Sequence, residues 1–379
     1  MDKQKGFTLV EVMVGVVIAL ISMIAMFMVQ ENWDKQRSSI TSGGDAQVAG
    51  SISAFNLERN LRNAGSGFGN SNFLGCTVSA QDAIGARNFS FTLAPVVITD
   101  GAGGLPDTIS ILAGNSNSPT ATFEVASSTQ TVTTMKDTRT GLSLGDLVIL
   151  ATPSPTTCRL AEISNLQPPG TNSGRETGHL TASYSRTSEP PENRQSGAAG
   201  ACTGSAPGPW TCVPRYPSVS FTTFTSVPPA YGELRSLGDD PRLNVYAVDQ
   251  ARGALTRSEL IHEGTTATDI GEGIINLQAQ YGLDTNNDDI IDTWQATTPT
   301  WTQLRAVRFA LLARGEHYES VAVTTAAPTW SGGTFAMRNV DGTADSGAGN
   351  LGVNNWRNYR YSVFEATVPL RNMIWRRFW

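Results

Sequence analysis

The feature that most constrains this chain is an apolar run near its N-terminus, FTLVEVMVGVVIALISMIAMFMV. The run spans residues 7–29 and contains a single charged residue, Glu11. As a helix it would be about 34 Å long, which is enough to cross the hydrocarbon core of a bilayer. Lys3 and Lys5 precede it, and positive residues beside a membrane segment favour the cytoplasmic side. We therefore expect a single-pass membrane protein with a cytoplasmic N-terminus and an exported body.

Two ordinary kinds of targeting segment account for this run less well. A cleaved secretory signal has a shorter apolar region and a small-residue cleavage site, and no A-x-A sequence follows this run. A simple signal anchor fits the length but leaves Glu11 unexplained. A carboxylate within a membrane helix costs up to about 3 kcal/mol on insertion and usually has a partner. The alternative is that Glu11 lies close enough to the interface to stay hydrated.

The stretch KGFTLVEVMVGVVIALI resembles the class III signal of type IV prepilins. In that signal a short basic leader ends in Gly and is followed by Phe, Thr, Leu, a hydrophobic residue and Glu. The corresponding residues here are Gly6, Phe7, Thr8, Leu9, Val10 and Glu11. The resemblance implies that residues 1–6 are a leader peptide, which a prepilin peptidase removes by cleaving between Gly6 and Phe7. The same enzyme would methylate the new amino group of Phe7, and residues 7–29 would form the transmembrane and filament-core helix.

The physical chemistry of Glu11 agrees with a role in assembly. A buried carboxylate needs a partner, and opposite charges attract more strongly in a low-dielectric helix core than in water. We expect the α-amino group of a neighbouring subunit to satisfy Glu11 in a filament.

The helix is predicted to continue past the membrane, over about residues 7–64, because no proline occurs before Pro95. Residues 30–64 would be an amphipathic extension. We expect a bend near residues 42–44, since Gly43 and Gly44 lower helix propensity, and Asp45 could cap a restart.

An apolar stripe of Val48, Ile52 and Phe55 has helical spacing, and further apolar residues continue nearby, namely Leu57, Leu61 and Ala64. We expect this stripe to dock on a sheet. Gly65 is a candidate C-cap.

After Gly65 the pattern changes to short strands separated by turns. Predicted strands lie within residues 89–99, 107–113, 121–134, 145–152, 158–163, 218–227, 242–249, 273–283, 304–315 and 359–370. Residues 167–209 and 330–352 are predicted to be long loops. The predicted fold class is α+β, with a long N-terminal transmembrane helix packed on an antiparallel β-rich globular domain of residues 65–379, as in pilins.

The four cysteines are Cys76, Cys158, Cys202 and Cys212, and no pair has the CxxC spacing that zinc sites usually need. An exported body favours two disulfides, for which three connectivities exist. We favour Cys202–Cys212, which closes the short, turn-rich loop CTGSAPGPWTC, and this choice leaves Cys76–Cys158. The alternative is buried free thiols.

The charge balance of the chain bears on which class of partner it can bind. The net charge is −6 and charged residues make up 16% of the chain, whereas a nucleic-acid binder normally carries a basic surface. We expect no nucleic-acid partner.

Three later stretches are similar to PilW-type minor pilins: LERNLRNAGSGFG followed by Cys76, LRAVRFALLAR, and YSVFEATVPLRN. They also resemble the J-type pseudopilin of type II secretion, but the length of this chain favours the minor pilin. The resemblance implies a structural subunit that primes pilus assembly and sits in the tip complex, supporting adhesion or motility. Its expected partners are other minor pilins, the major pilin and a large adhesin-like tip protein. The expected location is the inner membrane, with a periplasmic body, and then the extracellular pilus.

A candidate calcium loop lies within YGLDTNNDDIIDTW. Side-chain oxygens of Asp284, Asn286, Asp288 and Asp292 and the carbonyl of Ile290 follow the spacing of an EF-hand-like loop. Asp289 replaces the turn glycine, and Gln295 replaces the bidentate glutamate. Calcium is therefore a candidate cofactor of weak affinity, about 10⁻⁴–10⁻³ M. The alternative is an acidic Asx-turn between strands.

An enzyme or binding module anchored to the membrane in the periplasm is the alternative from another class. GLSLG matches G-x-S-x-G in letters, with Ser143 at its centre. A nucleophile elbow needs a strand before the serine and a helix after it, whereas GDLVILA after Ser143 reads as a strand. We therefore expect no enzymatic activity.

Overall fold

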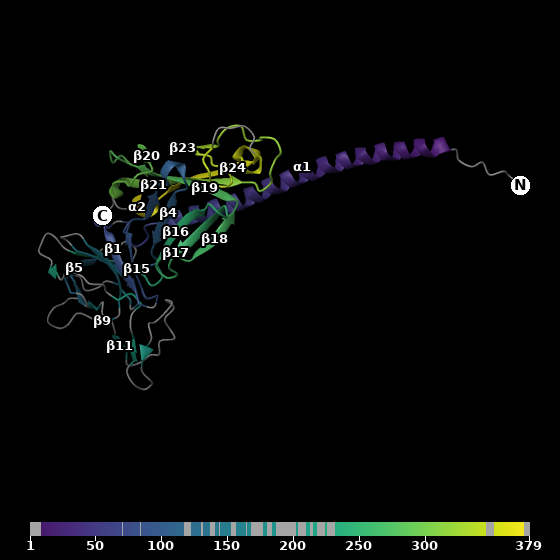
Figure 1. The fold of residues 1–379 in the computed structure, drawn as a ribbon. Coiled ribbons are helices and arrows are strands. Elements are labelled where there is room, and N and C mark those ends of the chain that lie inside the picture. Colours follow the sequence, from purple (N-terminus) through teal and green to yellow (C-terminus); the bar gives the residue numbers. More distant parts are fainter. Residues whose placement is uncertain are drawn as a thin grey trace.

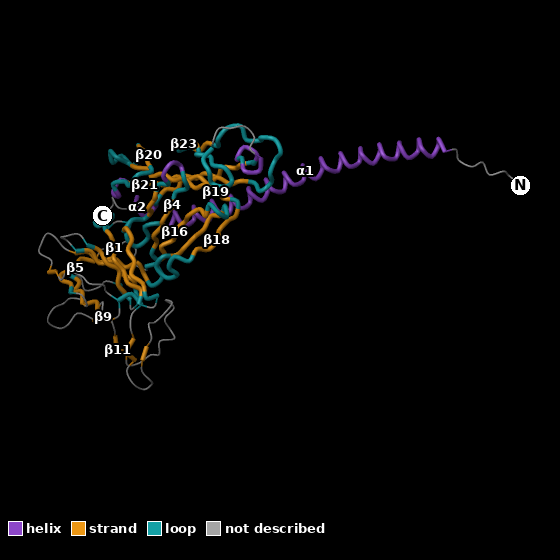
Figure 2. The backbone as a smooth tube through the Cα atoms, in the orientation of Figure 1, coloured by secondary structure: helices purple, strands orange, loops and turns teal. Residues whose placement is uncertain are grey.

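The computed structural model describes residues 9–69, 71–83, 85–116, 123–129, 132–136, 141–143, 145–152, 157–163, 165–167, 177–179, 184–186, 202–203, 210–212, 215–217, 224–225, 232–345 and 352–374. One long helix, α1, spans Leu9–Asn63, and its N-terminal part projects from a β-rich body (Figure 1). Strands and loops make up nearly all of that body (Figure 2). The predicted α+β class is confirmed.

Helix α1 continues without interruption through Gly43 and Gly44, so the predicted restart at Asp45 is wrong. The two glycines cost about 1 kcal/mol each in helix propensity, and docking of the residues that follow, beginning at Ala46, offsets this cost. The helix ends where Gly65 adopts the left-handed conformation (φ +79°) and its amide donates to the carbonyl of Leu112. The predicted stop at Gly65 is confirmed.

Two antiparallel sheets pack against the C-terminal part of α1 (Figure 1). The four-stranded sheet has the order β20-β19-β21-β24, with bounds Thr293–Gln295, Ile274–Leu283, Leu304–Arg314 and Tyr361–Pro369. The five-stranded sheet has the order β18-β17-β16-β4-β3, with bounds Ala267–Glu272, Ala254–Glu259, Arg242–Asp249, Thr108–Ala113 and Val96–Thr99. Both sheets and the helix contribute buried side chains to one hydrophobic core.

A larger sheet lies beyond the C-terminal end of α1 (Figure 1). Its path is β2-β1-β8-β7-β15-β5-β6-β10-β9, and β14 also pairs with β5. The bounds, in path order and then β14, are Arg87–Thr92, Thr77–Asp82, Cys158–Glu162, Leu147–Ala151, Gly232–Gly238, Phe123–Ser128, Val132–Met135, Thr177–His179, Asn165–Gln167 and Phe224–Thr225. Strands β1 and β8 form a parallel pair. Two further clusters of buried apolar side chains stabilise this sheet.

Smaller elements complete the body. A three-stranded sheet has the order β11-β13-β12 (Tyr184–Arg186, Trp210–Cys212, Cys202–Thr203), and a hairpin pairs β22 with β23 (Thr329–Trp330, Gly333–Thr334). The short helices are η1 Ala102–Gly104, η3 Trp301–Gln303, η4 Gly352–Asn354, η5 Trp356–Asn358 and α2 Arg371–Ile374.

The structure departs from the first of the two predicted loops more than from the second. Within residues 167–209, strands β10, β11 and β12 pair with other strands, so a single strand-free loop is wrong there. The remaining residues of that stretch lie outside the described part of the chain. Residues 330–352 begin with the hairpin and are then irregular as far as residue 345.

Candidate assembly interface

The N-terminal part of α1 is an apolar rod that is exposed along its described length. Residues Leu9–Glu31 form a helix long and apolar enough to cross a membrane, and none of it is buried within the molecule. The hydroxyl of Ser22 is satisfied inside the helix, because it donates to the carbonyl of Ile18 (2.9 Å). So large an apolar surface needs a cover of lipid or of other protein. The predicted apolar helix is confirmed.

The residues of the predicted cleavage and assembly site lie at the start of this rod. Glu11 sits in the first turn of α1 and is exposed. An acidic side chain in the first turn also interacts favourably with the helix dipole. Gly6 and Phe7 lie outside the described residues, so cleavage between them and methylation of Phe7 stay predictions.

The C-terminal part of α1 docks with a face of small and apolar residues. Its buried members are Ala46, Gly50, Ser53, Leu57, Leu61 and Ala64. The ring of Phe364 on β24 covers Gly50, and Gly271 on β18 approaches Ser53. Small side chains therefore let the helix approach both sheets closely.

The stripe predicted to dock is the one that stays exposed. Val48, Ile52 and Phe55 are 60%, 51% and 64% exposed, so their predicted burial against a sheet is wrong. Leu57, Leu61 and Ala64 are buried as expected. Large apolar residues occupy both faces of this part of the helix, and the closest helix–sheet contacts lie at Gly50 and Ser53. The apolar surface of α1 thus extends well beyond its membrane-length segment.

One predicted disulfide is present. Cys76 and Cys158 are bonded, with 6.1 Å between their Cα atoms, and they join the start of β1 to β8. Cys202 and Cys212 are directly opposite each other in the register of β12 and β13, a placement that suits a disulfide. Their side chains are outside the described part of the structure, so this second bond stays a prediction.

The predicted calcium loop connects β19 to β20. Asp284 is fully buried and pairs with Arg305 (3.1 Å). Its carboxylate also accepts hydrogen bonds from the amides of Asp288 (3.1 Å) and Asp289 (3.2 Å). A calcium ion at this loop would have to compete with Arg305 for Asp284.

The other oxygens of this loop are also engaged within it. Asp288 accepts from the amide of Ile290 (2.8 Å) and from the side chain of Asn286 (3.1 Å). Asp292 accepts from the hydroxyl (2.8 Å) and the amide (2.7 Å) of Thr285, and hydrogen bonds from Thr285 are the main reason that the pKa of Asp292 is lowered. Among the described residues, no three His, Cys, Asp or Glu side chains are arranged to hold a metal. Calcium binding stays a prediction, and its test is a calcium-dependent rise in melting temperature that Asp288→Ala removes.

Ser143 does not lie on a nucleophile elbow. Its amide donates to Asp146 (3.1 Å), and the strand β7 begins shortly after it. A strand in this position replaces the helix that would orient a nucleophile.

A buried ion-pair cluster was missed by the sequence analysis. Asp82 at the end of β1 pairs with Arg87 (3.2 Å) and Arg215 (3.1 Å). Burial alone raises the pKa of Asp82, but hydrogen bonds from Arg215 and Gly85 and the charges of both arginines outweigh it and lower the pKa. Period-2 alternation could have found it, because Asp82 shares the buried face of β1 with Val78 and Ala80. The cluster ties the end of β1 to Arg87 and Arg215 inside the body.

Comparisons with known families agree with this architecture. A family model of the prokaryotic N-terminal methylation motif matches residues 1–27, and together with the projecting apolar helix this match fits a membrane-anchored, pilin-like protein. A model of Type IV Pilus-assembly protein W matches residues 245–372, which extend from β16 through β24 into α2. These two matches support a type IV pilin-like protein of the PilW family. Both families are structural pilus components, not enzymes. Searches of curated proteins and of solved structures found no significant match.

Proposed function

We propose that this chain is a minor type IV pilin that primes pilus assembly and sits in the tip complex. Before assembly it is a single-pass inner-membrane protein with a cytoplasmic N-terminus and a periplasmic body. Prepilin peptidase cleaves between Gly6 and Phe7 and methylates Phe7, and Glu11 then pairs with the α-amino group of a neighbour. Other minor pilins, the major pilin and a large adhesin-like protein are its partners.

The observation that carries this proposal is the extent of exposed apolar surface on α1. A membrane anchor needs only about 20 apolar residues, and Leu9–Glu31 already supplies them. The exposed stripe of Val48, Ile52 and Phe55 lies beyond that segment, on the helix face turned away from the sheets. A stripe of this kind is suited to packing against another helix. Packing between helices explains the stripe, and a simple anchor leaves it without a role.

The experiment is mass spectrometry of the protein recovered from native membranes and from sheared filaments. We expect an intact mass and an N-terminal peptide that begin at N-methyl-Phe7, with the mature chain in the sheared fraction. Gly6→Val should block cleavage, because a side chain at this position keeps the peptidase from the backbone. Glu11→Ala should spare cleavage and reduce incorporation. An uncut chain found only in the membrane would overturn the proposal.

A further inference from the structure

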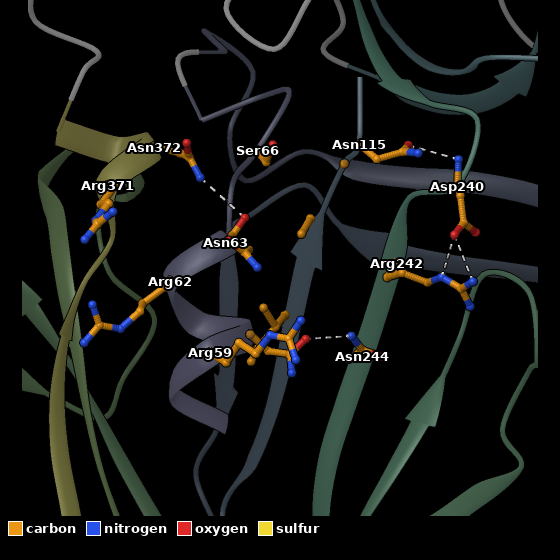
Figure 3. Close-up of a pocket in the computed structure, with 14 residues that line it drawn as sticks. Arg59, Arg62, Asn63, Ser66, Asn115, Asp240, Arg242, Asn244, Arg371 and Asn372 are labelled. Atoms are coloured by element: carbon orange, nitrogen blue, oxygen red, sulfur yellow. Dashed lines mark hydrogen bonds and ion pairs between the residues drawn. The ribbon is translucent and has the colours of Figure 1, made fainter. Parts of the chain in front are cut away.

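A cavity of about 710 Å³ opens where the C-terminal end of α1 meets β4, β16 and α2 (Figure 3). Four arginines line it, namely Arg59, Arg62, Arg242 and Arg371, together with the carboxylate of Asp240. The volume is in the range of pockets that bind ligands. The lining therefore carries an excess of positive charge.

Two of these arginines have carboxylate partners and two do not. Arg62 pairs with Glu58, and Arg242 pairs with Asp240 (2.9 Å). Within the described ranges, Arg59 and Arg371 make no hydrogen bond or ion pair, and both are exposed. Their guanidinium groups are available to a carboxylate from outside, which guanidinium binds in a bidentate manner.

Asparagines and Ser66 supply the rest of the polar lining. Asn244 donates to the side-chain oxygen of Asn60 (3.3 Å), which ties β16 to α1. Asn372 donates to the carbonyls of Ala64 (2.9 Å) and Asn63 (3.4 Å), which ties α2 to the end of α1. Figure 3 shows the bond to Asn63. The walls are thus fixed by hydrogen bonds between separate elements. An asparagine amide can both donate to and accept from a peptide backbone, so the lining suits an extended peptide better than a lone inorganic ion.

The position of the cavity excludes the membrane as the source of the anion. Continuous helix separates Glu31 from Arg59 by about 42 Å, at a rise of about 1.5 Å per residue. The potential of a charged membrane surface decays within a Debye length, about 8–10 Å at physiological salt. A lipid head group beside the membrane segment therefore cannot reach Arg59.

We propose that this cavity binds an acidic peptide segment of a partner subunit, through Arg59 and Arg371. That the partner is a pilus subunit rests on the proposed function. That the cavity binds an acidic peptide does not rest on it. The two proposals can therefore fail separately: an unprocessed N-terminus would leave the cavity intact, and an inert cavity would leave the processing intact.

The test is fluorescence anisotropy with the full chain in detergent. The probe is a short labelled peptide in which Asp alternates with Ser, and the control peptide carries Asn in place of Asp. We expect the acidic peptide to bind at least about 10-fold more tightly than the control peptide, and its binding to weaken with salt. Arg59→Gln combined with Arg371→Gln should remove this preference without changing the melting temperature, because both side chains are exposed.

Matched controls decide the outcome. Arg252→Gln removes an exposed arginine in the turn at the opposite end of β16 and should leave binding unchanged. Equal binding of both peptides, or acidic binding that survives the double substitution, would overturn the proposal. Displacement of the peptide by an equal concentration of inorganic phosphate would overturn it as well and assign the cavity to small anions.

Discussion

The ring of Phe364 on β24 occupies the space that a Cβ atom at Gly50 of α1 would fill. Gly271 on β18 approaches Ser53 on the same part of the helix from the other sheet. Residues without bulk therefore set the distance at which α1 packs between its two sheets. The same packing leaves Val48, Ile52 and Phe55 of the helix on the outside.

Enlarging Gly50 should therefore loosen the body. We expect Gly50→Leu to lower the free energy of unfolding by about 1–3 kcal/mol, because Phe364 has to leave its packed position. Gly44→Leu is the matched control, since Gly44 is exposed and no atom lies near its Cβ position. That change should raise stability by up to about 1 kcal/mol through helix propensity. Urea unfolding of the purified chain in detergent measures both, and equal effects would contradict this packing.

The two faces of α1 should separate stability from assembly. Leu57 is fully buried, so Leu57→Ala should cost about 2–5 kcal/mol of unfolding free energy. Phe55 is largely exposed, and Phe55→Ser should change stability by no more than about 0.5 kcal/mol. We nevertheless expect Phe55→Ser to lower the amount of protein in sheared filaments, measured by immunoblot against the membrane fraction. If the Phe55→Ser variant enters filaments as well as the wild-type protein does, the exposed stripe has no part in packing between subunits.

The Cys76–Cys158 disulfide should contribute strongly to the stability of the larger sheet. It closes a sequence separation of 82 residues, for which the chain-entropy model gives about 4.5 kcal/mol before strain. We expect the double substitution Cys76→Ser with Cys158→Ser to lower the free energy of unfolding by about this amount, measured as a lower urea midpoint. Cys202→Ser with Cys212→Ser should have a smaller effect, since that loop is short. Peptide mapping without reduction tests the second bond directly, and free thiols at Cys202 and Cys212 would refute it.

Much of the fold was predictable where hydrophobic pattern and local chemistry agree. The run RLNVYAVD was predicted as a strand and is β16 with the same bounds, Arg242–Asp249. It is rich in β-branched and aromatic residues, which favour strands. The end of α1 at Gly65 was predictable for a local reason as well, because glycine adopts the left-handed conformation without strain.

Strand β15 shows why other parts were not predictable. Its sequence GELRSLG reads as polar, yet all of Gly232–Gly238 is buried. Glu233 and Arg235 form an ion pair inside the body, and the glutamate also accepts from the amide of Asn72 (3.2 Å). A buried charge is tolerated only with such partners, and a partner as distant in sequence as Asn72 cannot be read from a local pattern. The same limit hid the arginine-lined cavity, since four separate elements contribute to it.

We expect the contribution of Asp107 to folding stability to fall as the pH rises. An aspartate in an ordinary ion pair has the opposite dependence. Its carboxylate accepts from the amides of Gly101 (2.9 Å) and Ala279 (2.7 Å). Burial nevertheless raises its pKa from 3.8 to about 6, and the charge of Asp100 adds to the rise. The folded state therefore holds this proton more tightly than the unfolded state. The contribution of Asp107 to stability is full below about pH 4 and declines as the pH rises through about 6.

Asp107→Ala should accordingly cost more unfolding free energy at pH 4 than at pH 7. Urea unfolding of the wild-type and substituted chains across this range measures the difference at each pH. Asp249→Ala is the control, because its hydrogen bonds and ion pair with Arg252 lower the pKa of Asp249. The contribution of Asp249 is present above pH 3.8 and is lost only as the pH falls further, so its cost should be nearly the same at pH 4 and at pH 7. A cost of Asp107→Ala that grows towards neutral pH would show that the folded protein does not retain a proton on this carboxylate.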